Sequence, residues 1–145
     1  METITSPKST LVNLLRRLKK LSPKQKMLAG LDVTYAQIRL LRTVSNFSGN
    51  TMKQISNSLG LAFPTLSKSA CTLLKQGLLD LRPDPDDRRK KRVHLTQEGE
   101  IIVRNFIREE EKLASQFLSG LLPEEQDIFL DLLEKVISVA EASNV

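Results

Sequence analysis

The chain has 145 residues, 40% of them hydrophobic and 27% charged, and a formal net charge of +5. That length fits one domain, or one domain with added dimerisation helices, and the apolar fraction suffices for a packed core. The single cysteine excludes an intrachain disulfide, and the single histidine disfavours a zinc site within one chain. We therefore expect no metal and no other cofactor, and metalloenzyme chemistry is disfavoured.

The net charge hides a larger asymmetry along the chain. Residues 1–50 carry nine Lys or Arg against two acids, residues 51–96 carry nine against four, and residues 97–145 carry four against eleven. Such a split is expected of a protein whose basic part faces an anion and whose acidic part faces solvent. No apolar run is long enough to span a bilayer, and residues 1–9 lack the apolar core of a secretory signal, so we expect a cytoplasmic protein.

The first predicted helix is basic and amphipathic. Ser9 or Thr10 can cap it, and Ser22-Pro23 is expected to end or kink it. Its apolar stripe consists of Leu11, Leu14, Leu15, Leu18 and Leu21. We interpret it as a dimerisation helix with a solvated basic face; contact with a phosphate backbone and attachment to a membrane surface are the alternatives. The membrane alternative is the weakest, because the apolar stripe lacks Trp or Phe anchors.

Two shorter helices are predicted next. Thr34-Tyr-Ala-Gln37 has the form of a capping box, and the helix that it starts ends in the loop 45–50, which is rich in Ser, Asn and Gly. The following helix is capped by Thr51 and ends at Gly60, a residue free to adopt positive φ. The residues predicted to be buried are Ile38, Leu40, Leu41 and Val44 in the first helix and Met52, Ile55 and Leu59 in the second.

A further helix is predicted from Pro64 to Gln76. Pro64 suits a first helical turn, whereas Ala62 before it lacks the side-chain oxygen that usually caps a helix. The residues predicted to face the core are Leu66, Ala70, Leu73 and Leu74. The opposite face is then polar, with Lys68 and Ser67 placed to reach base edges and Thr65 and Lys75 placed to reach a phosphate backbone.

The stretch from Asp84 to Gly99 is the most informative part of the sequence. Asp84-Pro85 favours a turn, and five consecutive cations follow at residues 88–92. Alternating apolar residues on both sides of the turn predict a β-hairpin, with Leu79 and Leu81 in one strand and Val93 and Leu95 in the other. A hairpin with concentrated positive charge suits the phosphate backbone of a nucleic acid. Together with the two helices before it, this hairpin predicts a winged helix-turn-helix that binds duplex DNA.

Two long helices are predicted after the hairpin. Thr96 caps the first, which runs to about Ser119, and Pro123 starts the second after a break at Gly120. Their apolar residues are Ile102, Phe106, Leu113 and Phe117, then Ile128, Phe129, Leu132, Leu133, Val136, Ile137 and Ala140. This apolar surface exceeds what a small winged domain can cover, so we expect a homodimer. The predicted fold is mainly α with a small β-hairpin wing: a winged helix-turn-helix over 31–99, and a helical dimerisation region over 1–30 and 100–145.

The order of these elements and two motifs resemble the MarR (multiple antibiotic resistance regulator) family. The motifs are Gly77-Leu78-Leu79 and the stretch from Asp84 to Gly99, in which Asp-Pro-Asp-Asp-Arg-Arg precedes Val-x-Leu-Thr-x-x-Gly. The resemblance covers nearly the whole chain. It implies a homodimeric bacterial transcription regulator, usually a repressor, that a ligand or oxidation releases from its operator.

The resemblance also implies roles for individual residues. Ser67 and Lys68 occupy the positions of the family's Thr-Arg pair, which faces the major groove. Asp87 and Arg89 match the Asp-x-Arg of the wing, in which the acid orients an arginine that enters the minor groove. Lys68 departs from the more common arginine, which weakens bidentate reading of guanine. The predicted DNA-binding residues are Thr65, Ser67, Lys68, Lys75, Asp87, Arg88, Arg89 and Lys90.

The resulting hypothesis is a repressor that binds a pseudo-palindromic operator and is relieved by a small aromatic or phenolic effector. The alternative is a winged-helix protein-interaction module with no operator of its own, whose wing meets an acidic partner. An enzyme is the weakest hypothesis, because no nucleophile–base pair, phosphate loop or ligand cluster is evident. We interpret Cys71 as a small semi-buried residue without a redox role, and His94 as an outward-facing polar residue.

Overall fold

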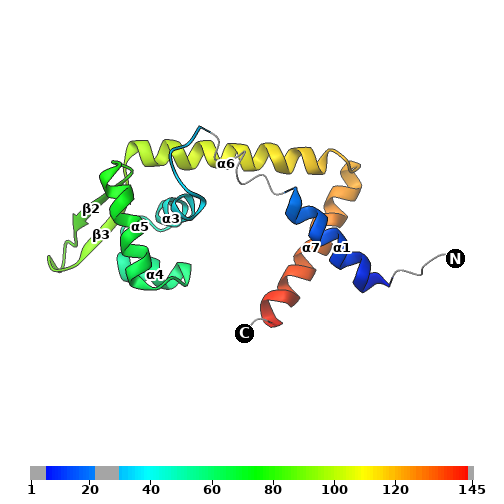
Figure 1. The fold of residues 1–145 in the computed structure, drawn as a ribbon, viewed down its shortest axis with the longest axis horizontal. Coiled ribbons are helices and arrows are strands. Elements are labelled where there is room, and N and C mark those ends of the chain that lie inside the picture. The colour runs from blue at the N-terminus through cyan, green and yellow to red at the C-terminus, as the bar shows by residue number, and fades with distance from the viewer. Residues whose placement is uncertain (1–5, 22–29, 144–145) are drawn as a thin grey trace. The chain divides into compact units, whose positions relative to one another are not determined.

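The computed structural model describes residues 6–21 and 30–143, and Figure 1 shows its elements. Within these residues the chain is mainly helical with a small three-stranded antiparallel sheet, which confirms the predicted fold class. The elements are α1 (Pro7–Lys20), α3 (Tyr35–Asn46), β1 (Asn50–Thr51), α4 (Met52–Leu59), α5 (Phe63–Lys75), β2 (Leu79–Pro83), β3 (Lys91–Leu95), α6 (Gln97–Leu118) and α7 (Pro123–Ser143). The chain divides into two compact units, Met1–Val103 and Arg104–Val145, and the boundary falls inside α6.

Helix α1 begins earlier than predicted. Ser6 is its N-cap, and the Ser6 hydroxyl accepts the backbone N–H of Ser9 at 3.3 Å. Pro7 takes the first helical position, where its missing N–H costs nothing. The prediction that Ser9 or Thr10 caps this helix is therefore wrong, because both lie inside it. The helix ends at Lys20, and the predicted end or kink at Ser22-Pro23 lies outside the described residues.

The helix starts in the middle of the chain follow the prediction closely. Thr34 forms a reciprocal capping box with Gln37, with N–H···O distances of 3.2 and 2.9 Å. Thr51 forms a second box with Gln54, at 3.3 and 2.9 Å. These contacts satisfy backbone donors that the first helical turn would otherwise leave unpaired. Gly60 ends α4 in the left-handed region, with φ of 63°.

The core of the first unit is built from the predicted faces of α3, α4 and α5. Its buried residues are Ile38, Leu40, Leu41, Val44, Ile55, Leu66, Ala70, Leu73, Leu78, Leu79, Val93 and Val103. Met52, Leu59 and Leu74, which were also predicted to face inward, are only half-buried. The helix-turn-helix is thus fixed by packing on one face of each helix, which leaves the opposite face of α5 exposed.

The sheet contains a strand that the sequence did not predict. The β2–β3 hairpin pairs Leu79 with Leu95 and Leu81 with Val93, as the alternation indicated. Strand β1 then adds to the other edge of β3, with Thr51 opposite Arg92, so that the strand order is β1-β3-β2. Two residues are too few to show alternation, and for that reason Asn50 was included in a predicted loop and Thr51 was predicted only as a helix cap.

Thr96 joins the wing to α6. Its hydroxyl accepts the backbone N–H of Gly99 at 3.1 Å and donates to the carbonyl of Gly77 at 2.6 Å, which confirms its predicted capping role. At Gly99 a Cβ atom would lie 2.2 Å from the carbonyl oxygen of Leu78, so only glycine fits there. The Gly99 of the wing motif is therefore explained by close packing of α6 on the chain before β2.

Helices α1 and α7 contain no buried residue. Their apolar stripes are exposed, with Leu14 and Leu18 of α1 and Leu132 and Val136 of α7 all about half accessible. None of the helices within residues 6–21 and 30–143 is both long and apolar enough to cross a lipid bilayer.

Candidate nucleic-acid interface

Helix α5 has one anchored face and one free face. Leu66 and Leu73 have no accessible surface, and Ala70 has 2%. The four residues of α5 that were predicted to contact DNA all lie on exposed positions: Thr65, Ser67, Lys68 and Lys75. Cys71 is also exposed, so the interpretation of this residue as semi-buried is wrong. It lies one helical turn from Lys68 and Lys75, on the outer side of the helix.

The turn before α5 is held by a serine that sequence reasoning missed. The Ser56 side chain is buried, and its hydroxyl donates to the carbonyl of Leu61 at 2.6 Å. Ala62 makes no side-chain cap, as predicted, and the first turn of α5 has no acidic residue. The positive end of this helix is therefore left available to an anion. Ser56 stands among other polar residues of α4, so the sequence does not single it out as the residue that holds this turn.

At the tip of the wing, Asp87 holds Arg89. The Arg89 Nε lies 3.1 Å from Asp87 Oδ1, and the Arg89 backbone N–H donates to the same oxygen at 3.1 Å. The side-chain hydrogen bond from Arg89 and its backbone N–H lower the pKa of the Asp87 carboxyl below the ordinary value of 3.8. The Arg89 side chain is 91% exposed, so the pair presents a restrained guanidinium to solvent.

At the base of the wing, a buried aspartate pairs with a second arginine that is partly exposed. The Asp84 side chain is 5% exposed; its Oδ2 accepts a hydrogen bond from Arg92 Nε at 2.7 Å and forms an ion pair with Arg92 Nη2 at 2.6 Å. Asp84 Oδ1 accepts the backbone N–H groups of Asp86 at 2.8 Å and Asp87 at 3.0 Å. These two backbone hydrogen bonds, with Arg92, hold the pKa of Asp84 below 3.8. Arg92 therefore does not belong to the cationic tip in which the sequence placed it.

Arg92 also reaches across the sheet to another loop. Its Nη1 donates to the carbonyl of Gly49 at 2.6 Å, and the Gly49 N–H donates to the carbonyl of Val93 at 3.1 Å. Neighbouring His94 contacts Ser48 side chain to side chain, with 3.1 Å between the hydroxyl oxygen and Nδ1. His94 is thus half-buried against the loop before β1.

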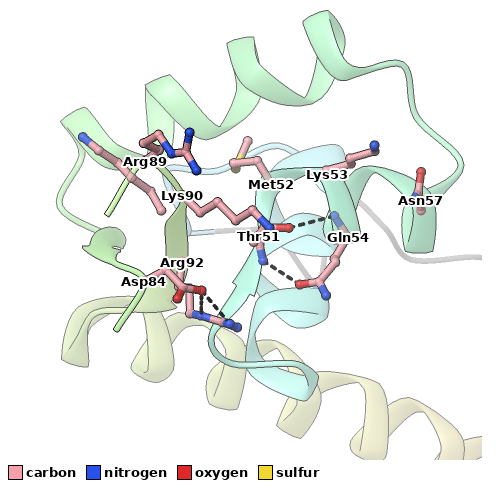
Figure 2. Close-up of a pocket in the computed structure, with 10 residues that line it drawn as sticks. Thr51, Met52, Lys53, Gln54, Asn57, Asp84, Arg89, Lys90 and Arg92 are labelled. Carbon is pink, nitrogen blue, oxygen red and sulfur yellow. Dashed lines mark hydrogen bonds and ion pairs between the residues drawn. The ribbon is translucent and has the colours of Figure 1, made fainter. Parts of the chain in front are cut away.

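A groove of about 760 Å³ separates the wing from the N-terminal part of α4 (Figure 2). It is lined by Thr51, Met52, Lys53, Gln54 and Asn57 on one side and by Asp84, Arg89, Lys90, Lys91 and Arg92 on the other. Asp84 is the one acid in this lining, and it is already paired with Arg92. The remaining cations make the groove strongly positive, which suits a polyanion.

Three comparisons with known proteins agree with this architecture. The model of the MarR family matches residues 31–90. The transcriptional regulator HosA of Escherichia coli O111:H- is 28% identical over 107 residues, which are 74% of this chain and 79% of HosA. A mutant of S. aureus MepR is 26% identical, with a TM-score of 0.77 over 91% of this chain and 97% of MepR.

Two further solved structures were determined with bound molecules. Another S. aureus MepR mutant, bound to an oligodeoxyribonucleotide, is 25% identical with a TM-score of 0.67 over 93% of this chain and 99% of MepR. The PcaV transcriptional regulator from Streptomyces coelicolor, in complex with its natural ligand, is 26% identical with a TM-score of 0.61 over 97% of both chains. The chain has the winged helix-turn-helix fold of these regulators, and over residues 31–90 it is similar to the MarR family of transcription regulators.

Proposed function

We propose that this regulator binds duplex DNA with α5 in the major groove and the wing in the adjacent minor groove. The single observation that carries the proposal is the restrained and exposed Arg89 beside Asp87. A guanidinium held in this way suits insertion into a narrow minor groove, where the negative potential is strongest. The oligonucleotide bound by the MepR mutant supports the same use of the fold.

The exposed face of α5 and the wing would supply the contacts. Lys68 and Ser67 reach base edges from the exposed face of α5, and Thr65 and Lys75 reach phosphates. Arg88 and Lys90, both exposed on the wing, add phosphate contacts. Phosphate contacts supply affinity without sequence information, so sequence preference rests mainly on Lys68 and Ser67.

The active form is a homodimer in this proposal. The exposed apolar stripes of α1 and α7 need a cover, and a second copy of the chain is the simplest one. Two-fold symmetry then places two α5 helices in successive major grooves about 10 base pairs apart, so the operator is pseudo-palindromic.

Such a dimer acts as a repressor that a small aromatic or phenolic ligand relieves. The solved complex of PcaV with its natural ligand supports ligand binding by this fold, whereas the repressor role and the aromatic or phenolic class of ligand rest on the resemblance to the family. A ligand relieves repression only to the extent that it binds the DNA-free conformation more tightly than the DNA-bound one. We therefore expect the ligand to lower operator affinity by the ratio of its affinities for the DNA-free and DNA-bound conformations. Binding equally well to both conformations would not change operator affinity.

Selection of genomic fragments with the purified protein identifies the operator, and fluorescence anisotropy then measures its Kd at fixed salt. Replacement of Arg89 by Ala is expected to weaken binding by about 1–3 kcal/mol, roughly five- to 150-fold in Kd. Arg82→Ala is the matched control, because Arg82 also pairs with an aspartate two residues away, at 3.1 Å from Asp80, but lies on β2. Its effect should be much smaller.

Two results would contradict the proposal. One is an unchanged binding isotherm for Arg89→Ala on the selected operator. The other is a wild-type protein that ignores every duplex, even in dilute buffer, and binds an acidic protein instead, as a winged-helix interaction module would. A salt titration separates these cases, because neutralising several phosphates gives a steep linear fall of log K with log salt concentration.

A further inference from the structure

The base of the wing is tied together by one carboxylate and one guanidinium. Asp84 lies just beyond the end of β2, and Arg92 lies on β3. We call Asp84, Arg92 and the carbonyl of Gly49 the wing clamp. The four hydrogen bonds and one ion pair of this clamp are all 3.0 Å or shorter. Because a buried carboxylate is costly unless it is fully paired, such completeness indicates a rigid arrangement.

The wing clamp connects three parts of the winged helix-turn-helix of residues 31–99, which we call the winged unit. Through Arg92 it joins β3 to the loop before β1, and β1 leads directly into α4. Through Asp84 it holds the backbone N–H of Asp87. The carboxylate of Asp87 in turn holds Arg89. A continuous path of hydrogen bonds thus runs from the loop beside α4 to the arginine at the tip of the wing.

Asp84 is an acidic residue in an otherwise positively charged groove, and its position needs an explanation. An acid in the lining of a groove that faces DNA should weaken DNA binding by repulsion. Asp84 is nevertheless placed there, with Arg92 directly against it. The two charges compensate each other, so neither contributes much to the attraction of phosphates. Their contribution must therefore come through geometry.

We propose that Asp84 and Arg92 are positioning residues that set the wing relative to α4 and aim Arg89, and that Arg92 does not itself contact DNA. This inference rests on the proposed DNA-binding function. Holding a contact residue in advance of binding removes an ordering cost that the complex would otherwise bear. A wing with a broken clamp retains all its phosphate-binding cations but holds them in many orientations.

The direction in which one substitution changes the affinity for DNA tests this proposal. Asp84→Asn removes a negative charge, and electrostatics alone predicts tighter binding to DNA. The wing clamp predicts the opposite, a Kd raised about tenfold, the lower end of the loss expected for a groove contact. Asp86→Asn is the matched control, since Asp86 is exposed in the same loop and carries the same charge. It should bind as tightly as the wild type or slightly more tightly.

A second substitution keeps the test independent of Asp84. Arg92→Lys retains the positive charge, but a single ammonium group cannot reach both oxygen partners in the way that the planar guanidinium does. If Arg92 were a phosphate contact, lysine would replace it well. As a positioning residue it should weaken binding about tenfold. The corresponding change at Arg82, an exposed arginine of β2 outside the proposed DNA contacts, is Arg82→Lys, which should have little effect.

Amide hydrogen exchange supplies a readout that a general loss of stability would not reproduce. The N–H groups of Asp86 and Asp87 should lose protection in Asp84→Asn, while the amides of α5 stay protected and the thermal transition stays cooperative. If Asp84→Asn does not fold, Arg92→Lys decides the matter with the same measurements.

The outcomes are distinguishable. Suppose that Arg89→Ala weakens DNA binding but that Asp84→Asn and Arg92→Lys bind as tightly as the wild type. This result would overturn the positioning role of the wing clamp and leave the proposed function standing. Wild-type protein that binds no duplex would overturn both. Weaker binding by Asp84→Asn and Arg92→Lys, beside unaltered binding by Asp86→Asn and Arg82→Lys, establishes the positioning role.

Discussion

The winged unit and the terminal helices differ in where their apolar residues lie. In the winged unit, α3, α4 and α5 bury their apolar faces within the same chain, and Leu41, Ile55 and Leu66 have no accessible surface. Helices α1 and α7 also have apolar stripes, but none of their residues is buried. The same periodic pattern therefore produces an internal core in one region and an uncovered surface in the other.

This difference teaches that the two regions depend on different partners. The winged unit can reach its folded state with its own contacts, whereas the stripes of α1 and α7 gain hydrophobic stabilisation only when another surface covers them. Mutations in the two regions should therefore act on different quantities. Those in the winged unit should change folding, and those in the terminal helices should change assembly.

The largest expected effect comes from placing charges on the stripe of α7. Leu132→Glu combined with Val136→Glu should give a monomer in sedimentation, because two carboxylates cannot be buried in an apolar interface. Operator affinity should then fall by about 100-fold or more, since each half-site is bound alone. Asp131→Asn combined with Lys135→Gln alters the same helix at two charged positions and should leave the dimer intact. A Glu variant that remains dimeric would contradict the assignment of this stripe to dimerisation.

A smaller effect, on the free energy of unfolding, separates folding from assembly when it is measured in the monomeric Leu132→Glu, Val136→Glu variant. There, Leu66→Ala should lower the free energy of unfolding by about 2–5 kcal/mol, the usual cost of a cavity in a packed core. Ile137→Ala should cost little in the same background, because its covering surface is already gone. Urea unfolding of both variants measures the contrast. Equal losses would show that α7 is packed within the single chain after all.

The fold was largely predictable because its signals are local. Spacings of three and four residues predicted the buried faces of α3 and α5, and the threonines at 34 and 51 marked two helix starts. The Asp87–Arg89 pair was also expected, since its members are only two residues apart and the side chains can meet without any tertiary contact. The assignment of DNA contacts to individual residues stays a prediction.

What the sequence could not predict depends on contacts between distant segments. In a run of five cations nothing distinguishes Arg92 from its neighbours until the sheet places it beside Asp84 and Gly49. Strand β1 exists only because β3 offers an edge to pair with. The burial of Ser56 and the exposure of Cys71 likewise follow from how α4 and α5 pack and not from their residue types.

The smallest expected effect is a dependence of stability on pH that belongs to the wing. The carboxyl groups of Asp84 and Asp87 have pKa values below 3.8 in the folded protein, Asp84 through backbone N–H groups and Arg92, Asp87 through Arg89. A depressed folded pKa means that the unfolded chain takes up protons first, so their stabilisation is complete above the ordinary pKa and is lost as pH falls through the folded value. Urea unfolding should therefore give a higher free energy of unfolding for the wild type than for Asp84→Asn at neutral pH. This difference should shrink in acid, as Asp84 itself becomes neutral. If the difference in free energy of unfolding stays constant from neutral to acid pH, the carboxylate charge does not stabilise the base of the wing, and only the shape of the side chain does.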